Sequence, residues 1–212
     1  IHNELEMNET LPSIISKLQN DPKYVKMFAN AFEDKKVSSK NMLKALAQFM
    51  TVMVSSNSKY DKYVRNEEGG GFSDDEKEGK ALFNQKCAAC HATDLFTDFS
   101  FRNNGLPVNP LLNDLGREEV SGNSLDRYKF KVPSLRNVAL TAPYMHDGRF
   151  GSLESVLNFY NDGMVDSQTI DPLLKNNHNV GLSLSSREKK LIIQFLNTLT
   201  DFEFIQNPKY KN

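Results

Sequence analysis

The sequence lacks several features that would indicate a particular partner. Neither charge is in excess, because 26 basic residues balance 27 acidic ones to a net charge of -1. This balance excludes electrostatic attraction as the basis for binding nucleic acid or an anionic membrane. The chain also lacks a run of about 18 apolar residues, so we expect no transmembrane helix.

The beginning of the sequence has neither a signal peptide nor a methionine, since its first residue is Ile1. We therefore expect a processed, proteolysed or truncated product from which an upstream segment has been removed. The 212 residues, of which 39% are hydrophobic, are enough for one or two compact domains.

Cysteine is scarce and informative. Only two cysteines occur, and both lie in the segment Cys87-Ala88-Ala89-Cys90-His91. C-x-x-C-H is the attachment signature of a c-type haem, in which the thiols add to the haem vinyl groups and the histidine reaches the iron. The motif predicts covalent haem binding and an oxidising compartment.

Three other interpretations of the cysteine pair are weaker. A structural disulfide would close a loop of two residues and restrain little. A thioredoxin-type redox pair would need a βαβ context, which the sequence does not indicate. Zinc needs four ligands, which only the scattered His2, His146 and His178 could complete.

The first 65 or so residues show helical periodicity. Thr10 and Asp21 are candidate N-caps, each followed closely by a proline. A third helix is expected over 39–56. The apolar positions at helical spacing are Leu11, Ile14, Ile15 and Leu18, then Tyr24, Met27, Phe28, Ala31 and Phe32, then Met42, Leu43, Leu46, Phe49, Met50 and Met53.

The rest of the chain alternates between helices and long loops. Glu67-Glu68-Gly69-Gly70-Gly71 is the best candidate for a domain boundary. Capping boxes at 73–76 and 185–188 predict two helix starts. Residues 92–149 are rich in Asn, Gly, Pro and Ser, which indicates a long segment with little regular structure, and a helix is expected from Ser152 to about Tyr160.

A nineteen-residue segment carries a resemblance to a known family. It reads Val132-Pro133-Ser134-Leu135-Arg136-Asn137-Val138-Ala139-Leu140-Thr141-Ala142-Pro143-Tyr144-Met145-His146-Asp147-Gly148-Arg149-Phe150. Together with Cys87–His91, the segments 152–154, 57–63 and Asn3-Glu4-Leu5-Glu6-Met7, it resembles the bacterial di-haem cytochrome c peroxidases. The resemblance covers essentially the whole chain, as the family's C-terminal two-thirds.

The resemblance implies an all-α fold in which a c-type cytochrome domain wraps one haem with long irregular loops, beside an N-terminal helical portion of a second domain. Residues 1–66 would be the helical remainder of the peroxidatic domain. Residues 67–198 would be the electron-accepting domain, and 199–212 a tail returning toward the first domain. Since this chain has one haem motif and no Trp, the family's first haem segment and its tryptophan between the haems are missing, and a second haem c is expected there.

The resemblance also implies site residues. Glu6 corresponds to the acidic residue beside the open haem, where it would shuttle protons. The position at which the peroxidases carry a methionine ligand falls fourteen residues after His146, on Tyr160. A related branch, which matures tryptophan-derived quinone cofactors, has a tyrosine there. Met164 and Met145 are the alternative ligands.

The implied function is the electron-accepting part of an enzyme that reduces hydrogen peroxide to water in the periplasm. Its expected partners are a small cytochrome c or cupredoxin as electron donor, the missing haem segment and a second copy in a homodimer. The backbone carbonyls of Thr141 and Pro143 resemble positions that help to hold a calcium ion. Two alternatives stay open: a mono-haem electron carrier without catalysis, and a maturation-type haem oxidase acting on a protein side chain.

The single C-x-x-C-H motif predicts one covalent haem per chain, with His91 as proximal ligand. Extraction with acidified organic solvent should leave the haem on the protein, and mass spectrometry should find one haem attached. His91→Ala should abolish stable low-spin haem. A haem that extracts into the solvent would contradict covalent attachment.

Overall fold

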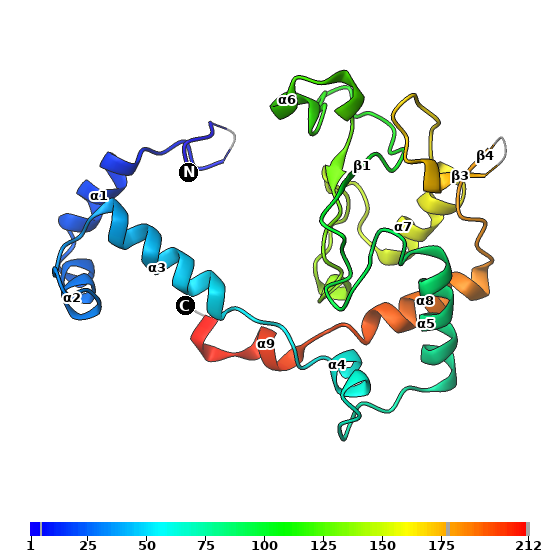
Figure 1. Ribbon diagram of the computed structural model, residues 1–212, viewed down its shortest axis with the longest axis horizontal. Helices are drawn as coiled ribbons and strands as arrows, with labels where there is room; N and C mark the ends of the chain where they lie inside the picture. Colours follow the sequence, from blue (N-terminus) through cyan, green and yellow to red (C-terminus); the bar gives the residue numbers. More distant parts are fainter. Residues whose placement is uncertain (5, 177–178, 211–212) are drawn as a thin grey trace. The chain divides into compact units, whose positions relative to one another are not determined.

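The computed structural model describes residues 1–4, 6–176 and 179–210 and divides the chain into two compact units, residues 1–54 and 55–212. Helices are the main regular structure of both units (Figure 1). Across these described residues, no helix is both long and apolar enough to cross a membrane.

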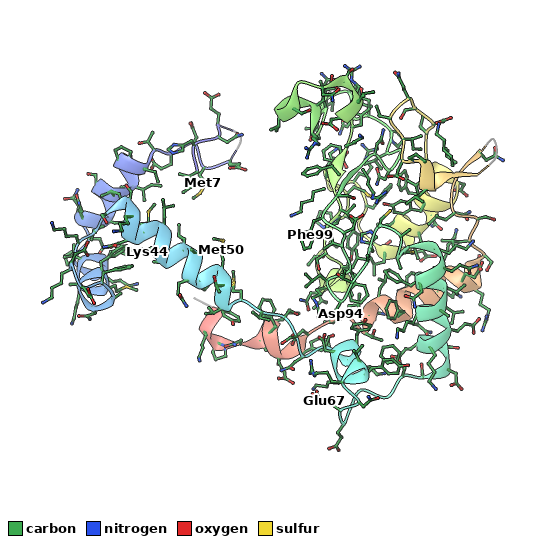
Figure 2. All side chains as sticks on the ribbon, in the orientation of Figure 1. Met7, Lys44, Met50, Glu67, Asp94 and Phe99 are labelled. Carbon is green, nitrogen blue, oxygen red and sulfur yellow. The ribbon has the colours of Figure 1, made fainter. Side chains whose placement is uncertain are left out.

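The first unit consists of α1 (Leu11–Gln19), α2 (Pro22–Ala31) and α3 (Ser39–Val52). Thr10 and Asp21 cap the first two helices as predicted. The predicted apolar face of α3 is only partly buried, since Met42 is buried, whereas Met50 is 62% exposed. Figure 2 labels Met50 on this helix. The buried residues that form the core of this unit are Phe28, Val37 and Met42.

The second unit holds the remaining elements. Its α-helices are α4 (Lys59–Val64), α5 (Asp74–Lys86), α6 (Glu118–Ser121), α7 (Leu153–Asn158), α8 (Ser186–Asn197) and α9 (Phe202–Gln206). The short helical turns are η1 (Ser124–Asp126), η2 (Val138–Leu140), the π-helical η3 (Phe159–Gly163), η4 (Pro172–Leu174) and η5 (Pro208–Tyr210). The predicted all-α class needs one addition, two short antiparallel pairs: β1 (Phe101–Arg102) with β2 (Phe130–Lys131), and β3 (Lys175–Asn176) with β4 (Asn179–Val180).

Helices α5 and α8 pack closely at the centre of the second unit. A Cβ added at Gly79 on α5 would lie 2.1 Å from the carbonyl oxygen of Leu191 on α8, so only glycine permits this approach. The fully buried Phe195 of α8 contacts Phe83 of α5 with ring centroids 5.1 Å apart and Phe96 with centroids 6.1 Å apart. The two capping boxes predicted at Ser73 and Ser185 start these two helices.

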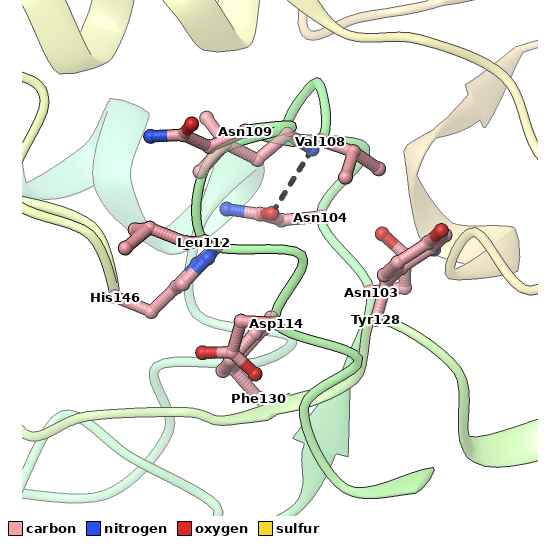
Figure 3. A pocket seen from close by; sticks show the side chains of 10 residues that line it. Asn103, Asn104, Val108, Asn109, Leu112, Asp114, Tyr128, Phe130 and His146 are labelled. Carbon is pink, nitrogen blue, oxygen red and sulfur yellow. Dashed lines mark hydrogen bonds between the residues drawn. The ribbon is translucent and has the colours of Figure 1, made fainter. Parts of the chain in front are cut away.

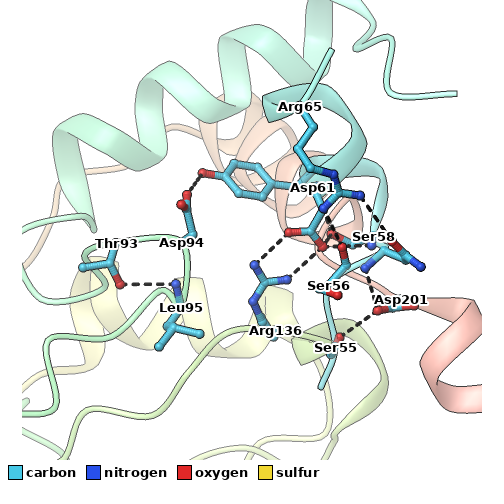
Figure 4. A network of polar contacts seen from close by, with 12 residues as sticks. Ser55, Ser56, Ser58, Asp61, Arg65, Thr93, Asp94, Leu95, Arg136 and Asp201 are labelled. Atoms are coloured by element: carbon cyan, nitrogen blue, oxygen red, sulfur yellow. Dashed lines mark hydrogen bonds and ion pairs between the residues drawn. The ribbon is translucent and has the colours of Figure 1, made fainter. Parts of the chain in front are cut away.

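The boundary between the units lies at Val54–Ser55, earlier than the glycine-rich joint that the sequence favoured. Helix α4 belongs to the second unit because its Tyr60 is buried in the core of that unit. Its Asp61 accepts two hydrogen bonds from the guanidinium of Arg136, at 2.8 and 2.9 Å, as Figure 4 shows. A local composition change cannot reveal such a pair, because its partners lie 75 positions apart.

The predicted tail, residues 199–212, falls within the second unit. Leu199 is completely buried in the core of the second unit. Asp201 then accepts a hydrogen bond from the backbone N–H of Asn57 at 2.9 Å and caps α9 (Figure 4). Residues 199–210 therefore belong to the second unit, and residues 211–212 lie outside the described part of the chain.

The close approach at Gly79 leads to a stability prediction. Gly79→Ala should lower the free energy of unfolding by about 1–3 kcal/mol, because the methyl group would overlap backbone atoms of α8. Gly71→Ala is the matched control, since nothing lies within 4 Å of a Cβ added there, and it should change stability by about 0.5 kcal/mol or less. Denaturant unfolding of the haem-loaded chain measures both, and equal stabilities of the two variants would contradict the packing argument.

Candidate haem site

The C-x-x-C-H segment forms a tight turn at the end of α5. Cys87 is the C-cap of α5, and its N–H donates to the carbonyl of Phe83 at 2.8 Å. The N–H of His91 donates back to the carbonyl of Cys87 at 3.0 Å. The turn therefore brings both thiols and the imidazole to one short stretch of chain. Both cysteines are free and partly buried.

The thiols differ from those of a redox-active pair. Burial raises the pKa of the Cys87 thiol to about 12 and also raises the pKa of Cys90. Redox-active C-x-x-C pairs show the opposite shift, because their thiolate is stabilised. The direction of these pKa shifts does not favour the thioredoxin-type alternative.

A zinc site finds no support either. No group of three His, Cys, Asp or Glu side chains placed to hold a metal occurs in 1–4, 6–176 or 179–210. His146 stacks on the ring of Phe130 with centroids 3.8 Å apart. His178 lies outside the described residues.

The imidazole of His91 is oriented by the backbone. Its Nδ1 lies 2.9 Å from the carbonyl oxygen of Phe96, and because a carbonyl only accepts, Nδ1 must carry the proton. Burial lowers the pKa of His91, against the opposing effect of the Phe96 and Pro133 carbonyls. The ring is therefore neutral, and Nε2 keeps a free lone pair for a metal. This is the form of histidine that binds iron.

The loop after His91 folds back over the motif. The N–H of Asp98 donates to the carbonyl of Cys90 at 3.0 Å. Arg102 bonds the carboxylates of both Asp98 and Asp171 at 2.7 Å. Although burial opposes it, hydrogen bonds from Ser100 and Arg102 hold the pKa of Asp98 at about 2. These charges fix the loop beside the cysteine motif.

Tyr160 lies on the π-helical turn that follows α7, whereas the sequence predicted a continuous helix to this point. Its N-terminal neighbour Phe159 is buried, and the carbonyl of Tyr160 accepts from the N–H of Leu182 at 2.9 Å. Single π-helical turns are frequent at functional sites. The half-buried phenol is close enough to both thiols for them to contribute to its raised pKa, of which burial is the main cause.

The phenol oxygen of Tyr160 accepts a hydrogen bond from the side-chain amide of Asn104 at 3.1 Å. This bond acts to lower the pKa of the phenol, against the effect of burial. The same amide nitrogen lies 3.7 Å from the sulfur of Met145. Asn104 also lines a small pocket with His146 and Tyr128 (Figure 3). Two of the three candidates for the ligand opposite His91 therefore share one polar partner.

The other predicted residues lie elsewhere. Met164 is buried, and its Cβ packs beside Gly105. Glu6 belongs to the first unit, where its side chain is 65% exposed. Its neighbour Leu5 lies outside the described residues. The catalytic role of Glu6 stays a prediction.

The donor set around the motif fits a covalently bound haem. Two unpaired thiols, a neutral imidazole with one nitrogen held by a carbonyl, and a phenol oxygen all belong to the same part of the second unit. Cys87 and Cys90 would hold the group, and His91 and Tyr160 are the candidate ligands of its iron. When bound, haem supplies an iron that changes its charge by one electron at a time.

Sequence reasoning missed two participants, Asn104 and the carbonyl of Phe96. The segment Asn103-Asn104-Gly105 is a turn signal in the sequence, but nothing local indicates that its amide meets Tyr160. Every residue has a backbone carbonyl, so the residue type of Phe96 cannot indicate that its carbonyl meets His91. Both contacts depend on how distant loops fold together.

The similarity to known proteins agrees with this geometry. A family model described as di-haem cytochrome c peroxidase matches residues 1–69. The methylamine utilization protein MauG of Methylorubrum extorquens is 37% identical over 92% of this chain and 54% of that protein. The cytochrome c peroxidase Ccp of Escherichia coli is 32% identical over 93% of this chain and 40% of that protein.

Solved structures share the fold. A MauG-like protein associated with microbial copper homeostasis superposes with a TM-score of 0.78 at 29% identity, over 94% of this chain and 65% of that one. The diheme peroxidase BthA from Burkholderia thailandensis gives a TM-score of 0.75 at 21% identity, over 96% of this chain and 62% of that one. The chain spans about half the length of the curated relatives it matches.

Proposed function

The chain belongs to the di-haem cytochrome c peroxidase family, and from this premise we propose that it is the electron-accepting haem portion of a peroxidase. In this role it passes electrons from a small redox protein toward the reduction of hydrogen peroxide to water. Each peroxide consumes two electrons and two protons and yields two waters. The convergence of Cys87, Cys90, His91 and Tyr160 in one unit is the observation that carries this proposal.

The side chains around the site would hold the haem and shield it from water. Cys87 and Cys90 would anchor the group. The hydrogen bond from Nδ1 of His91 to the Phe96 carbonyl orients the ring and leaves Nε2 for the iron. Phe83 and Phe96, which are 2% and 3% exposed, form the apolar core behind the motif. An anchored, oriented and water-poor site reduces the reorganisation that accompanies each electron transfer.

Tyr160 is the proposed ligand opposite His91. Its phenol is close enough to both thiols for them to affect its pKa, and its oxygen accepts a hydrogen bond from the Asn104 amide. A phenolate oxygen favours ferric and higher oxidation states, whereas a thioether favours ferrous iron. The buried Met164 is a weaker candidate than Tyr160. Its Cβ packs beside Gly105, whereas Tyr160 and Met145 both contact the amide of Asn104.

A maturation-type oxidase that acts on a protein side chain is the second candidate function. The tyrosine at the ligand position favours it, because an oxygen ligand stabilises the oxidised iron that such chemistry needs. The identity to the MauG of Methylorubrum extorquens is also higher than that to the Escherichia coli peroxidase. The mono-haem carrier is not favoured, because residues 1–69 match the peroxidase family model.

The proposed function also implies a compartment and partners. The periplasm is the proposed compartment, and a second haem c, a small cytochrome or cupredoxin and a second copy of the chain are the proposed partners. Calcium binding through the carbonyls of Thr141 and Pro143 is proposed on the family resemblance alone.

Tyr160→Phe tests the ligand assignment. The variant should raise the reduction potential and open a coordination site, because a neutral ring replaces an anionic oxygen. A redox titration and the ferric absorption spectrum measure both effects. Met164→Leu is the control and should leave the spectrum unchanged. An unchanged Tyr160→Phe spectrum would make the assignment wrong.

The isolated 212-residue chain should show little peroxidase turnover, because it carries a single haem motif. It should nevertheless accept electrons from a reduced small cytochrome in a stopped-flow experiment without peroxide. Steady-state oxidation of the same cytochrome with peroxide then measures turnover. Robust peroxide reduction by a chain of verified mass would contradict the proposed division of labour between two haems.

A further inference from the structure

The loop that carries Asn104 is held in place on both sides. Asn103 is buried, and its amide donates to the hydroxyl of Thr169 at 2.9 Å. Gly105 has a φ of +73°, and a Cβ added there would lie 2.9 Å from the side chain of Ile170. The neighbours of Asn104 are thus tied to the 164–171 segment, which leaves its backbone little freedom.

The orientation of the Asn104 amide is fixed as well. The backbone N–H of Leu106 donates to its Oδ1 at 3.3 Å, the bond drawn as a dashed line in Figure 3. Because Oδ1 accepts this bond, the NH2 group must be the side that faces Tyr160. The phenol oxygen at 3.1 Å is therefore an acceptor.

The NH2 group has two acceptors within reach, and they are unequal. The oxygen of Tyr160 lies at 3.1 Å and the sulfur of Met145 at 3.7 Å. Thioether sulfur is a weak acceptor, whereas phenol oxygen is a strong one. Met145 also has a φ of +73°, an uncommon conformation for a residue other than glycine. One amide thus touches both candidate ligand atoms and binds the oxygen better.

We propose that Asn104 is a positioning residue that selects the oxygen of Tyr160 over the sulfur of Met145 as the atom opposite His91. The inference rests on the proposed ligation by Tyr160 and extends it. Donation from the NH2 group holds the phenol oxygen in place. The contact with sulfur is longer and weaker, so the thioether of Met145 is held less firmly than the phenol oxygen.

The experiment replaces Asn104 in the haem-loaded chain. Asn104→Leu removes the donor with little change in volume, and Asn104→Asp removes it while keeping the acceptor for Leu106. In both variants the ratio of oxygen-bound to sulfur-bound haem should fall by about tenfold or more, the change expected for one lost hydrogen bond to a charged oxygen. The ferric absorption and electron paramagnetic resonance spectra separate the two ligand types, and the reduction potential should rise with the sulfur-bound fraction.

Three further variants make the result specific. Asn109→Leu is the matched control, because Asn109 lines the same pocket and accepts a backbone bond from Leu111, and its spectrum should not change. Adding Met145→Leu to Asn104→Leu should remove the sulfur signal. If Tyr160→Phe alters the spectrum and neither Asn104 variant does, only the selection by Asn104 is overturned. An unchanged Tyr160→Phe spectrum overturns the ligation and the selection together.

Discussion

The close packing of α5 on α8 is the constraint on which the site depends. Gly79 permits the approach, and the cysteine motif follows directly at the end of α5. The ammonium group of Lys86 then donates to the carbonyl of Leu182 at 3.4 Å, while the N–H of Leu182 donates to Tyr160. The cysteine motif and the segment of Tyr160 are therefore both connected to α5.

Burial determines the charge state of the site. It lowers the pKa of His91 and raises those of the Cys87 thiol and the Tyr160 phenol, so it favours the neutral form of each group. The positive charge of a bound iron would have to offset this effect for Tyr160 to ligate as a phenolate. The hydrogen-bond partners of His91 and Tyr160 are also neutral: the Phe96 carbonyl bonds the imidazole, and the Asn104 amide bonds the phenol oxygen. Such partners can orient the candidate ligand atoms without adding a charge beside a bound metal.

Much of the local structure could be predicted from the sequence. Thr10, Ser73 and Ser185 start helices as expected, because a capping side chain meets an N–H only a few residues away. The C-x-x-C-H motif is equally local, since one turn of chain brings Cys87 and His91 together. The helix that leads to Tyr160 was predicted too, but its last turn is π-helical, where the carbonyl of Tyr160 is bonded to Leu182.

The sequence by itself determined the haem motif, the helix starts and the helix-rich class, because each depends on residues close along the chain. Only the tertiary structure decided the unit boundary, the tautomer of His91 and the partner of Tyr160. Asp61 and Arg136 lie 75 positions apart, and Asn104 and Tyr160 lie 56 apart. Hydrogen bonds over such separations form only after the core has packed, and they leave no periodic pattern in the residues that make them.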